Sequence, residues 1–477
     1  MTLVSAVSLA GAVRRGTIDP VDLVDAAAAR MAELEPVLHA FCTPTLDLAR
    51  EQAAAVRDAV AAGDDPGPLA GVPIAVKDLI ATAGVRTTGG FAAYAELVPD
   101  EDDIVVERVR AAGAVMIGKT NVSELGYGPL SSNPVFPATR NPWNPDLTSG
   151  GSSAGSAVAV ATGMTPVALG SDGGGSIRTP AALCGVVGIK ASMGRVPLYP
   201  GCRDERLPGL SSWESLEHIG PLALTVADSA LLLSVIAGPD PRDRHSIPVT
   251  DVDWLGAVRA GTTTGVTGLR IGFSEDWGYA HVEPEIRRLA RQAAGVFAGL
   301  GAIVEPVTAP WSDPGEVFEA LVALETDLNG LRPLIREQGG RVGPRLRGLA
   351  SRDWRAEQFT DAITGRKAVC NAMWRLMRQH DLILTPAVAG AAPPVTTVSP
   401  DQPGIPQGWN SFAFIANLTG QPAASLPAGL DQSGMPVGIQ LIGPHLGDEV
   451  LLRACAAFEA AAPFPRLPQS PLQGVST

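Results

Sequence analysis

The sequence predicts an α/β protein whose sheet carries helices on its faces. Short runs rich in β-branched and apolar residues alternate with helical segments from residue 70 onward, and this alternation is typical of α/β architectures. Hydrophobic residues make up 45% of the 477-residue chain and charged residues 18%, so the chain can bury a large core. The runs that we expect to form strands are VPIAVKD, AVMIGKT, TPVALGS and VVGIKAS.

Residues 5–60 are expected to be helical. Asp19 followed by Pro20 is a typical helix start, and apolar side chains then recur every four residues from Leu23. A second amphipathic run covers residues 45–62. A helical segment therefore precedes the alternating α/β part of the chain.

The chain beyond residue 200 is expected to add loops and helices before it returns to strands. Residues 200–215 are rich in Gly, Pro and Trp, and GPDPRDRHSIP (238–248) is typical of a surface loop. The predicted elements after that are a helix-dominated stretch at 284–382, a strand at LILTPAV, a Pro-rich loop at 388–408, strands at AASLPAG and PVGIQLIG, and a closing helix near 447–461. We expect one large domain made of an N-terminal helical segment (1–65), a core (66–200), a region of helices and loops (201–400) and a C-terminal α/β part (401–477).

Composition and charge exclude several classes of protein. The net charge of −13 comes with scattered Lys and Arg rather than a basic stripe, so we expect no nucleic-acid partner. The longest low-polarity stretch, 154–170, is interrupted by Gly163 and Pro166 and is unsuited to crossing a membrane. An odd number of cysteines without a CxxC pair predicts neither a disulfide framework nor a zinc site. These cysteines are Cys42, Cys184, Cys202, Cys370 and Cys455.

The N-terminus and the cysteine usage favour a soluble cytoplasmic protein. The apolar run at the N-terminus has no basic residue before it and is followed by Arg14 and Arg15. That order is wrong for a secretory signal, and it suits a first helix with cations at its C-terminal end. Unpaired cysteines fit a reducing compartment.

Two familiar motifs occur in an unsuitable context. GAVMIGKT (113–120) satisfies the phosphate-binding loop G-x4-G-K-[ST], but its variable positions are an apolar run where that loop needs a glycine-rich turn. We expect a buried strand ending at Lys119 instead. GSSAG (151–155) satisfies the nucleophile elbow G-x-S-x-G with Ser153 at its centre, but a segment rich in Pro and Asn precedes it where a strand is required. Neither of the possible bases, His380 and His445, has an informative context.

Two blocks of glycines and hydroxyls carry the strongest chemical signal, together with one lysine. TSGGSSAGS (148–156) and GSDGGGS (170–176) follow a strand-like run that ends near Lys77. Burial favours the neutral form of a lysine, which makes Lys77 a candidate general base, and Ser–Lys pairs are a known variant of serine hydrolase chemistry. Each block alone is equally well explained as a tight turn, but with Lys77 they indicate a nucleophilic site.

Residues 150–192 resemble the amidase signature family. The family pattern is a Gly/Ser-rich run, then D-x-G-G-S-[IV]-R-x-P-A, then C-G-x-x-G-x-K-P-[ST], and the chain reads GGSSAGSAVAVATGMTPVALGSDGGGSIRTPAALCGVVGIKAS. The flanking segments GVPIAVKDLI, MIGKTNVSELGYG, GPLALTVADSALLL and NLTGQPAASLPAG are similar as well, so the similarity runs from about residue 5 to 460. It implies a large mixed β-sheet covered on both faces by helices. The departures are Gly173, where a bulkier residue is common, Ala154, where glycine is frequent, and KAS in place of K-P-[ST].

The resemblance assigns roles to individual residues. Ser176 matches the nucleophile, Ser152 the bridging serine that follows a cis peptide bond, and Lys77 the general base. The oxyanion hole matches the backbone N–H groups of Gly173, Gly174, Gly175 and Ser176. Supporting positions match Ser153, Asp172 and Arg178, and Cys184 matches a packing position.

These roles imply a serine amidohydrolase that forms an acyl-enzyme. Neutral Lys77 would draw a proton from Ser152, which draws one from Ser176 as Ser176 attacks a carbonyl. Backbone N–H groups aimed at one point stabilise the oxyanion. Water then cleaves the acyl-enzyme, so we expect no metal and no organic cofactor.

The substrate pocket is expected mostly outside the signature. Aromatic residues and few charges near it favour small neutral, partly apolar aryl or alkyl amides, and carbamates (urethanes) suit the same machinery. The nominated pocket residues are Tyr127, Gly128, Pro129, Trp213, Trp409 and Phe412. The alternative is a glutamine-dependent amidotransferase subunit that releases ammonia within a larger complex and shares every triad residue. Because members of the family are often dimers, a homodimer is the assembly expected outside such a complex.

Overall fold

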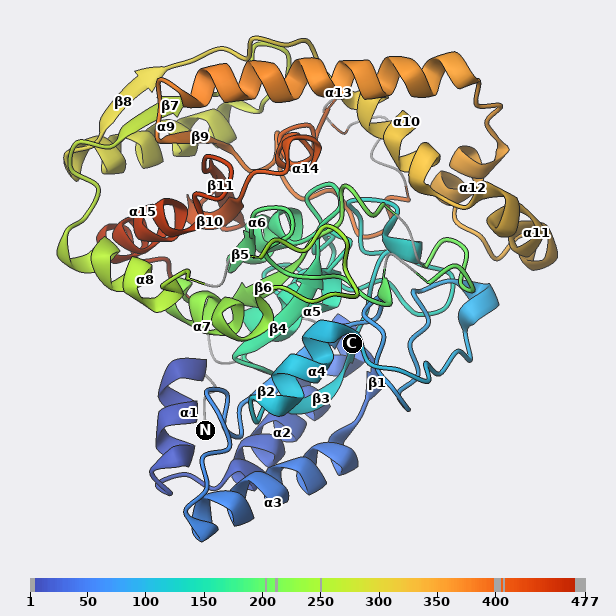
Figure 1. The fold of residues 1–477 in the computed structure, drawn as a ribbon, viewed down its shortest axis with the longest axis vertical. Coiled ribbons are helices and arrows are strands. Elements are labelled where there is room, and N and C mark those ends of the chain that lie inside the picture. The colour runs from blue at the N-terminus through green and yellow to red at the C-terminus, as the bar shows by residue number, and fades with distance from the viewer. Residues whose placement is uncertain are drawn as a thin grey trace.

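A single sheet of 11 strands forms the centre of the molecule (Figure 1). The computed structural model describes residues 5–201, 204–210, 213–248, 251–398, 405 and 408–467. The strands are β1 (Phe41–Pro44), β2 (Pro73–Lys77), β3 (Val115–Thr120), β4 (Val167–Ser171), β5 (Val187–Lys190), β6 (Ile219–Ala223), β7 (Arg270–Phe273), β8 (Ile303–Pro306), β9 (Leu382–Pro386), β10 (Ala423–Leu430) and β11 (Pro436–Ile442). Their order is β1-β3-β2-β4-β6-β5-β10-β11-β9-β7-β8.

The sheet is mixed, as predicted. Strand β2 runs parallel to both β3 and β4, whereas β4 pairs antiparallel with β6 and β10 antiparallel with β11. Helices α5 and α6 pack on the middle strands, while α7, α8 and α15 pack on one another, with α7 also against β6 and α15 against β10. The fold class expected from the sequence, a large mixed α/β sheet covered by helices, is therefore confirmed.

Fifteen α-helices accompany the sheet in the described residues. They are α1 (Ala6–Arg14), α2 (Pro20–Leu38), α3 (Leu46–Ala62), α4 (Ile104–Ala111), α5 (Ala154–Ala161), α6 (Arg178–Cys184), α7 (Val226–Ile236), α8 (Trp254–Thr263), α9 (Pro284–Gly299), α10 (Gly315–Glu325), α11 (Leu328–Gln338), α12 (Pro344–Ser351), α13 (Ala356–Met377), α14 (Ile415–Thr419) and α15 (Asp448–Ala461). The predicted start of α2 is correct, because the Asp19 side chain accepts a hydrogen bond from the Val21 N–H at 2.9 Å and Pro20 needs no such partner.

Sequence patterns missed four strands, namely the inner strands β6 and β7 and the two edges of the sheet, β1 and β8. Strand β1 lies inside the segment predicted to be helical, and β8 lies inside the helix-dominated stretch 284–382. Both have four residues and are partly exposed, so they lack the continuous apolar run that marks a buried strand. By contrast, every residue of β2 and β4 is buried.

The segments that match the phosphate-binding loop and the nucleophile elbow form neither of these structures, as their sequence context predicts. GAVMIGKT (113–120) forms the buried strand β3, and its Lys119 donates hydrogen bonds to the Thr82 hydroxyl at 2.8 Å and to the Ile80 carbonyl. This lysine is therefore held inside the protein. Ser153 precedes α5 and follows turns rather than a strand, so it does not sit on a strand-to-helix elbow.

Apolar side chains form two separate large clusters. The larger cluster covers the sheet and includes Val76, Leu169 and Ile177. The second lies under helices α10 to α12 and includes Tyr127 and Trp213. We call them the sheet cluster and the wall cluster.

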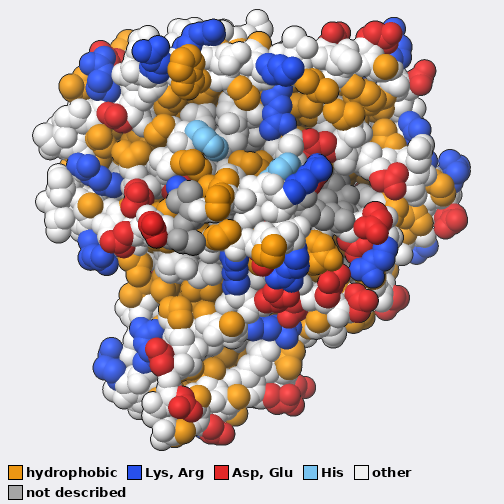
Figure 2. Space-filling view, in the orientation of Figure 1, with side chains coloured by type: hydrophobic (Ala, Val, Ile, Leu, Met, Phe, Trp, Pro, Cys, Tyr) orange, Lys and Arg blue, Asp and Glu red, His pale blue; other side chains and the backbone are white. Residues whose placement is uncertain are grey.

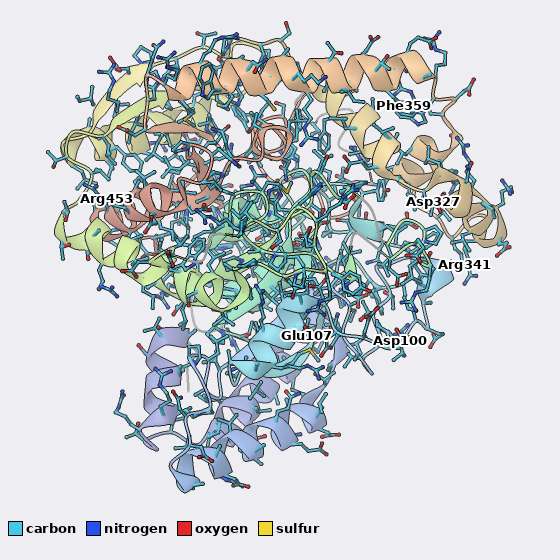
Figure 3. All side chains as sticks on the ribbon, viewed as in Figure 1. Asp100, Glu107, Asp327, Arg341, Phe359 and Arg453 are labelled. Atoms are coloured by element: carbon cyan, nitrogen blue, oxygen red, sulfur yellow. The ribbon has the colours of Figure 1, made fainter. Side chains whose placement is uncertain are left out.

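The surface carries mixed charge. On the face drawn in Figure 2, basic and acidic side chains are interspersed. Of the charged residues labelled in Figure 3, Asp100, Glu107, Asp327 and Arg341 are exposed and Arg453 is partly buried. Within the described ranges, no helix combines the length and the apolar character needed to cross a bilayer. Cys42, Cys184, Cys370 and Cys455 are free thiols, and Cys202 lies outside the described residues.

Candidate active site

A buried lysine contacts both glycine- and serine-rich blocks. Lys77 Nζ donates a hydrogen bond to Ser152 Oγ at 2.7 Å, to Ser171 Oγ at 2.8 Å and to the Ser171 carbonyl at 3.1 Å. The Ser153 N–H donates to the Ser176 carbonyl at 3.1 Å, which ties the first block to the second. The three residues of the predicted triad are all buried and lie in one region.

The sheet topology explains why these residues meet. Lys77 ends β2 and Ser171 ends β4, and these strands are parallel neighbours. Because parallel strands present their carboxyl ends at the same edge, both side chains reach the same end of the sheet, which is where α/β proteins place their ligands. Ser152 reaches the same place from the loop before α5, where the Gly151–Ser152 peptide bond is cis, as the resemblance implies.

The hydroxyls of Ser152 and Ser176 are not hydrogen-bonded to each other in the described residues. Ser176 instead faces a cavity of about 350 Å³, and Ser152 faces a neighbouring small cavity of about 30 Å³. Gly126 lines both cavities. A proton relay through Ser152 would need a contact that the two hydroxyls do not make here.

One of the four expected oxyanion donors is already used by the protein. The Gly175 N–H donates to Asp172 Oδ1 at 2.7 Å, so the expectation that it points at a substrate is corrected. The N–H groups of Gly173, Gly174 and Ser176 donate to no other group of the described chain. These three remain as candidate donors to an oxyanion.

The glycines are required by close packing around Ser176. A Cβ atom on Gly174 would lie 2.6 Å from the ring of Phe318, and one on Gly173 would lie 2.5 Å from both Glu217 Oε2 and the Trp213 ring. Gly175 has a φ of +107°, and its Cβ would collide with Ala413. A side chain at any of the three positions would displace the loop that carries Ser176.

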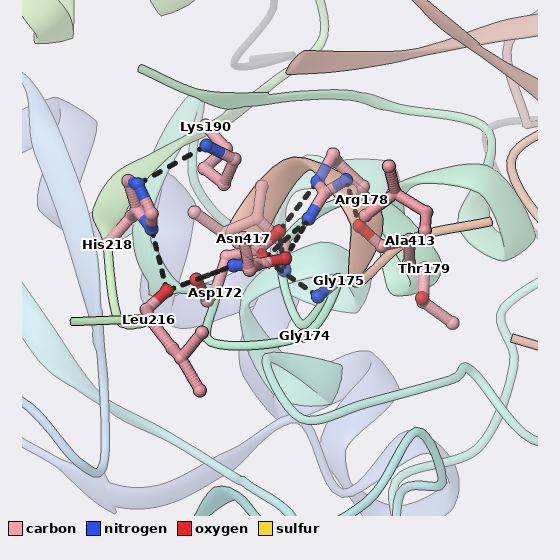
Figure 4. A network of polar contacts seen from close by, with 12 residues as sticks. Asp172, Gly174, Gly175, Arg178, Thr179, Lys190, Leu216, His218, Ala413 and Asn417 are labelled. Atoms are coloured by element: carbon pink, nitrogen blue, oxygen red, sulfur yellow. Dashed lines mark hydrogen bonds and ion pairs between the residues drawn. The ribbon is translucent and has the colours of Figure 1, made fainter. Parts of the chain in front are cut away.

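A buried ion pair holds this loop in place (Figure 4). Arg178 binds Asp172 in a bidentate manner, with Nε donating to Oδ2 at 2.9 Å and Nη2 donating to Oδ1 at 2.8 Å. Asp172 also accepts from the Gly175 and Ile177 N–H groups. Although burial opposes ionisation, the charge and hydrogen bonds of Arg178 hold the pKa of Asp172 well below its usual range. Asp172 and Arg178 therefore support the loop, as predicted for their positions.

The cavity beside Ser176 contains four of the nominated pocket residues. Tyr127, Gly128 and Trp213 line it together with Ser176, as does Pro129. The Tyr127 and Trp213 rings meet edge to face at 4.6 Å between centroids. A larger cavity of about 540 Å³ borders α15 and contains none of these residues.

Trp409 and Phe412 lie elsewhere, which corrects their nomination. Trp409 is buried and packs with Leu183 and Met435, and its indole N–H donates to the Gly390 carbonyl at 3.1 Å. Phe412 is fully buried in a third apolar cluster. Neither residue lines the cavity at Ser176. Both side chains turn into the core because their surroundings are apolar, whereas Asn410 between them faces the cavity.

Sequence reasoning missed four residues at the site. Ser171 belongs to the second glycine block but has no role in the family pattern, and Phe318, Asn410 and Glu217 lie far from the motif. Only Ser171 had a usable signal, as a hydroxyl at the end of a strand parallel to the one that ends in Lys77. Phe318 and Asn410 line the cavity, and Glu217 lies next to Ser152 and Ser171 in the small cavity.

Gly174→Ala is expected to lower kcat/KM by about ten- to a hundredfold. The added methyl would press on Phe318 and move a candidate oxyanion donor, and losing one such donor costs about that much or more. Gly295→Ala in α9 is the control, because its Cβ would meet nothing within 4 Å and should only stabilise the helix. Unchanged kinetics of the Gly174 variant would contradict its place in the site.

The described residues hold no group of three or more His, Cys, Asp or Glu side chains placed to bind a metal ion. The groups gathered around Ser176 include hydroxyls, one lysine amine and backbone N–H groups.

Comparison with known proteins gives a consistent picture. The family model described as Amidase matches residues 22–452. The A-subunit of glutamyl-tRNA(Gln) amidotransferase from Synechococcus sp. (strain RCC307) is 37% identical over 97% of this chain and 98% of its own. Its counterpart from Roseiflexus sp. (strain RS-1) is 36% identical over 99% of this chain and 100% of its own.

Solved structures of two kinds are similar to this one. A bacterial aryl acylamidase of the amidase signature enzymes has a TM-score of 0.87 with 32% identity, covering 97% of each chain. The A-subunit of glutamyl-tRNA(Gln) amidotransferase from Thermotoga maritima has a TM-score of 0.77 with 30% identity, covering 94% of each chain.

Proposed function

The chain belongs to the amidase signature family, and from this premise we propose that it cleaves the C–N bond of an amide through an acyl-enzyme on Ser176. The observation that carries the proposal is the 2.7 Å contact between buried Lys77 Nζ and Ser152 Oγ. The next residue, Ser153, donates its N–H to the carbonyl of Ser176, which lines a cavity. Membership of the family means an amidohydrolase or an amidotransferase.

The proposed reaction begins with transfer of two protons. Neutral Lys77 takes the proton of Ser152, and Ser152 takes that of Ser176 as its oxygen attacks the carbonyl carbon. The N–H groups of Gly173, Gly174 and Ser176 bind the oxyanion. The Ser152–Ser176 contact then forms in the substrate complex, since catalytic hydrogen bonds are often long without substrate.

The second half of the reaction uses the same groups in reverse. The Lys77 ammonium returns its proton through Ser152 to the leaving amine, and the C–N bond breaks. Water, deprotonated by the same relay, then attacks the acyl-enzyme and releases the acid. For a carbamate, the same steps release the amine or the alcohol, depending on which bond breaks.

We propose small, partly apolar amides as substrates, with carbamates as a variant. Aromatic side chains in the cavity wall, Tyr127, Trp213 and Phe318, support an apolar acyl or amine group. The structural similarity to an aryl acylamidase supports the same substrate class.

The second candidate is a glutamine-dependent amidotransferase component that works within a complex. The relatives from Synechococcus and Roseiflexus support this candidate better than the first. Arg345 also favours it, because this guanidinium lines the cavity close to Gly128 and would suit the carboxylate of glutamine. In that case the protein acts with partner subunits, whereas a free amidase acts alone or as a homodimer.

A substrate panel separates the two candidates. Anilides, primary amides, carbamates and glutamine are each offered to the purified chain, and acylation of Ser176 is followed by mass spectrometry. Turnover of anilides by the chain alone supports the amidase. Ammonia release from glutamine only after co-purified partner proteins are added supports the amidotransferase, and acylation of a residue other than Ser176 overturns both.

We also propose a cytoplasmic location and one large domain. The free thiols of the described cysteines support a reducing compartment. Segments 1–65, 66–200, 201–400 and 401–477 each contribute strands to the one sheet, which supports their folding as one unit.

A further inference from the structure

Glu217 is brought to the catalytic lysine by strand pairing. It precedes β6, which pairs antiparallel with β4 so that Ile219 lies opposite Ser171. The Asp172 N–H donates to the His218 carbonyl at 2.7 Å. This hydrogen bond continues the pairing of β4 with β6 by one residue beyond the end of each strand. Glu217 therefore lies beyond the end of β6 and beside Ser171.

Ser171 connects Glu217 with Lys77. The Ser171 hydroxyl oxygen accepts a hydrogen bond from Lys77 Nζ at 2.8 Å, and Ser171 and Glu217 line the same small cavity, where Ser171 lowers the pKa of the Glu217 carboxyl. Since the hydroxyl accepts from the lysine, its own proton is free to be donated to the carboxylate. Ser171 thus lies between Lys77 and Glu217, in the position from which it can connect the amine to the carboxylate.

The surroundings place the carboxyl group beside the two serines and against Gly173. Glu217 lines the small cavity together with Ser152 and Ser171, and a Cβ on Gly173 would lie 2.5 Å from Glu217 Oε2. Gly173 stands where a bulkier residue is common in the family. In this chain the glycine makes space for the glutamate.

We propose that Glu217 is the terminal carboxylate of the relay and, through Ser171, stabilises the ammonium that forms on Lys77 when Ser176 attacks. This inference rests on the proposed function and names a further positioning residue for it. Glu217 touches neither substrate nor the reacting atoms. Its role corresponds to that of the aspartate in a Ser-His-Asp triad, which stabilises the charged base without taking its proton.

The proton balance leaves Glu217 ionised throughout. The Ser176 proton moves to Ser152 Oγ as the bond from Ser176 Oγ to the carbonyl carbon forms and the carbonyl electron pair moves to oxygen. The original Ser152 proton moves to Lys77 Nζ, giving an ammonium that donates to Ser171 Oγ. The carboxylate raises the basicity of Lys77 and lowers the energy of this charged state.

The charged groups that face Glu217 determine the pH range of the effect. Burial raises the pKa of Glu217 to about 7, the charge of Lys77 and the hydrogen bond of Ser171 lower it, and Asp172 raises it. Asp103, at the start of α4, lines the same cavity. Glu217 therefore becomes ionised as the pH rises through about 7, and its effect on Ser176 should grow over the same range.

Glu217→Gln tests the proposal through the reactivity of Ser176 itself. Phenylmethanesulfonyl fluoride transfers its sulfonyl group to a serine oxygen with loss of fluoride, so its inactivation rate reports nucleophile activation without a known substrate. The rate is measured from pH 5.5 to 9.5, with the adduct located by mass spectrometry. Below pH 7 we expect wild type and E217Q to be inactivated at the same rate. At high pH we expect the plateau rate of E217Q to be about tenfold lower than that of the wild type, and the midpoint of its pH profile to lie about one pH unit lower.

Two further variants complete the experiment. Ser171→Ala removes the bridging hydroxyl and should show the pH profile expected for E217Q. This variant therefore tests the proposal even if E217Q does not fold. Glu214→Gln is the control, because Glu214 lies in the same segment and pairs instead with Arg244 at 2.5 Å.

Each outcome decides one question. Absence of a Ser176 adduct in the wild type overturns the proposed function. A Ser176 adduct with identical pH profiles for wild type, E217Q and S171A overturns the role of Glu217 and leaves the function standing. A uniform loss of rate at every pH, with no change of midpoint, also overturns it because it indicates a merely structural role.

Discussion

Ser176→Ala is expected to lower kcat/KM for the substrate identified by the panel by about 10⁴- to 10⁶-fold, the range seen when a serine nucleophile is removed. Alanine leaves no oxygen to form the acyl-enzyme, while the candidate oxyanion donors and the cavity walls stay in place. Stopped assays and intact-protein mass spectrometry measure the loss of turnover and of the acyl adduct.

The Ser176 variant should fold normally. Its side chain is 8% exposed, and the change removes one oxygen without creating a large cavity. Ser433→Ala, on the exposed turn between β10 and β11, is the matched control and should keep full activity. Hydrolysis that continues at the wild-type rate in the Ser176 variant would assign the nucleophile to another residue.

Arg178→Met is expected to lower the free energy of unfolding by about 3–5 kcal/mol, the usual effect of breaking a buried ion pair. Methionine fills much of the volume but leaves Asp172 without its bidentate partner. Burial then favours protonation of Asp172, and its hydrogen bond to the Gly175 N–H weakens. Because this bond shapes the loop before Ser176, activity should fall together with stability.

A second buried pair separates the two effects. Arg195 Nε lies 3.1 Å from Asp448 Oδ2, and both side chains are nearly buried. Arg195→Met should therefore cost similar stability, measured by urea unfolding, and leave kcat/KM unchanged at a temperature where the variant is folded. Equal loss of activity in both variants would mean that Arg178 acts only through global stability.

Much of the middle of the fold could be predicted from the sequence because burial leaves a clear pattern there, although the buried strand β6 was missed. Strands β2 and β4 are short apolar runs with every residue buried, and a lysine at the end of such a run is unusual enough to mark Lys77. Edge strands such as β8 are half exposed. The composition of such edge strands resembles that of a loop or a short helix. They can be recognised as strands only from their hydrogen bonding to a neighbouring strand in the folded protein.

Site residues that are close to one another in the sequence could be predicted. Site residues that come together only when the chain folds could not. Asp172 lies beside the glycines before Ser176, so the motif itself identifies it. Glu217 reaches Ser171 only through the pairing of β4 with β6, which no local pattern reports. Trp409 shows the converse limit, because it directly precedes the cavity residue Asn410 in the sequence and still points into the core.

The separation of the wall cluster from the sheet cluster affects how the substrate specificity of such an enzyme can evolve. Lys77 and Ser171 belong to strands rooted in the sheet cluster, whereas Tyr127 and Trp213 belong to the wall cluster. Substitutions in the wall cluster can therefore change the shape of the cavity while the residues that carry out the reaction stay the same. A mutant library confined to positions such as Phe318 and Val322 should yield many folded proteins with new substrates, and one confined to β2 or β4 should yield few.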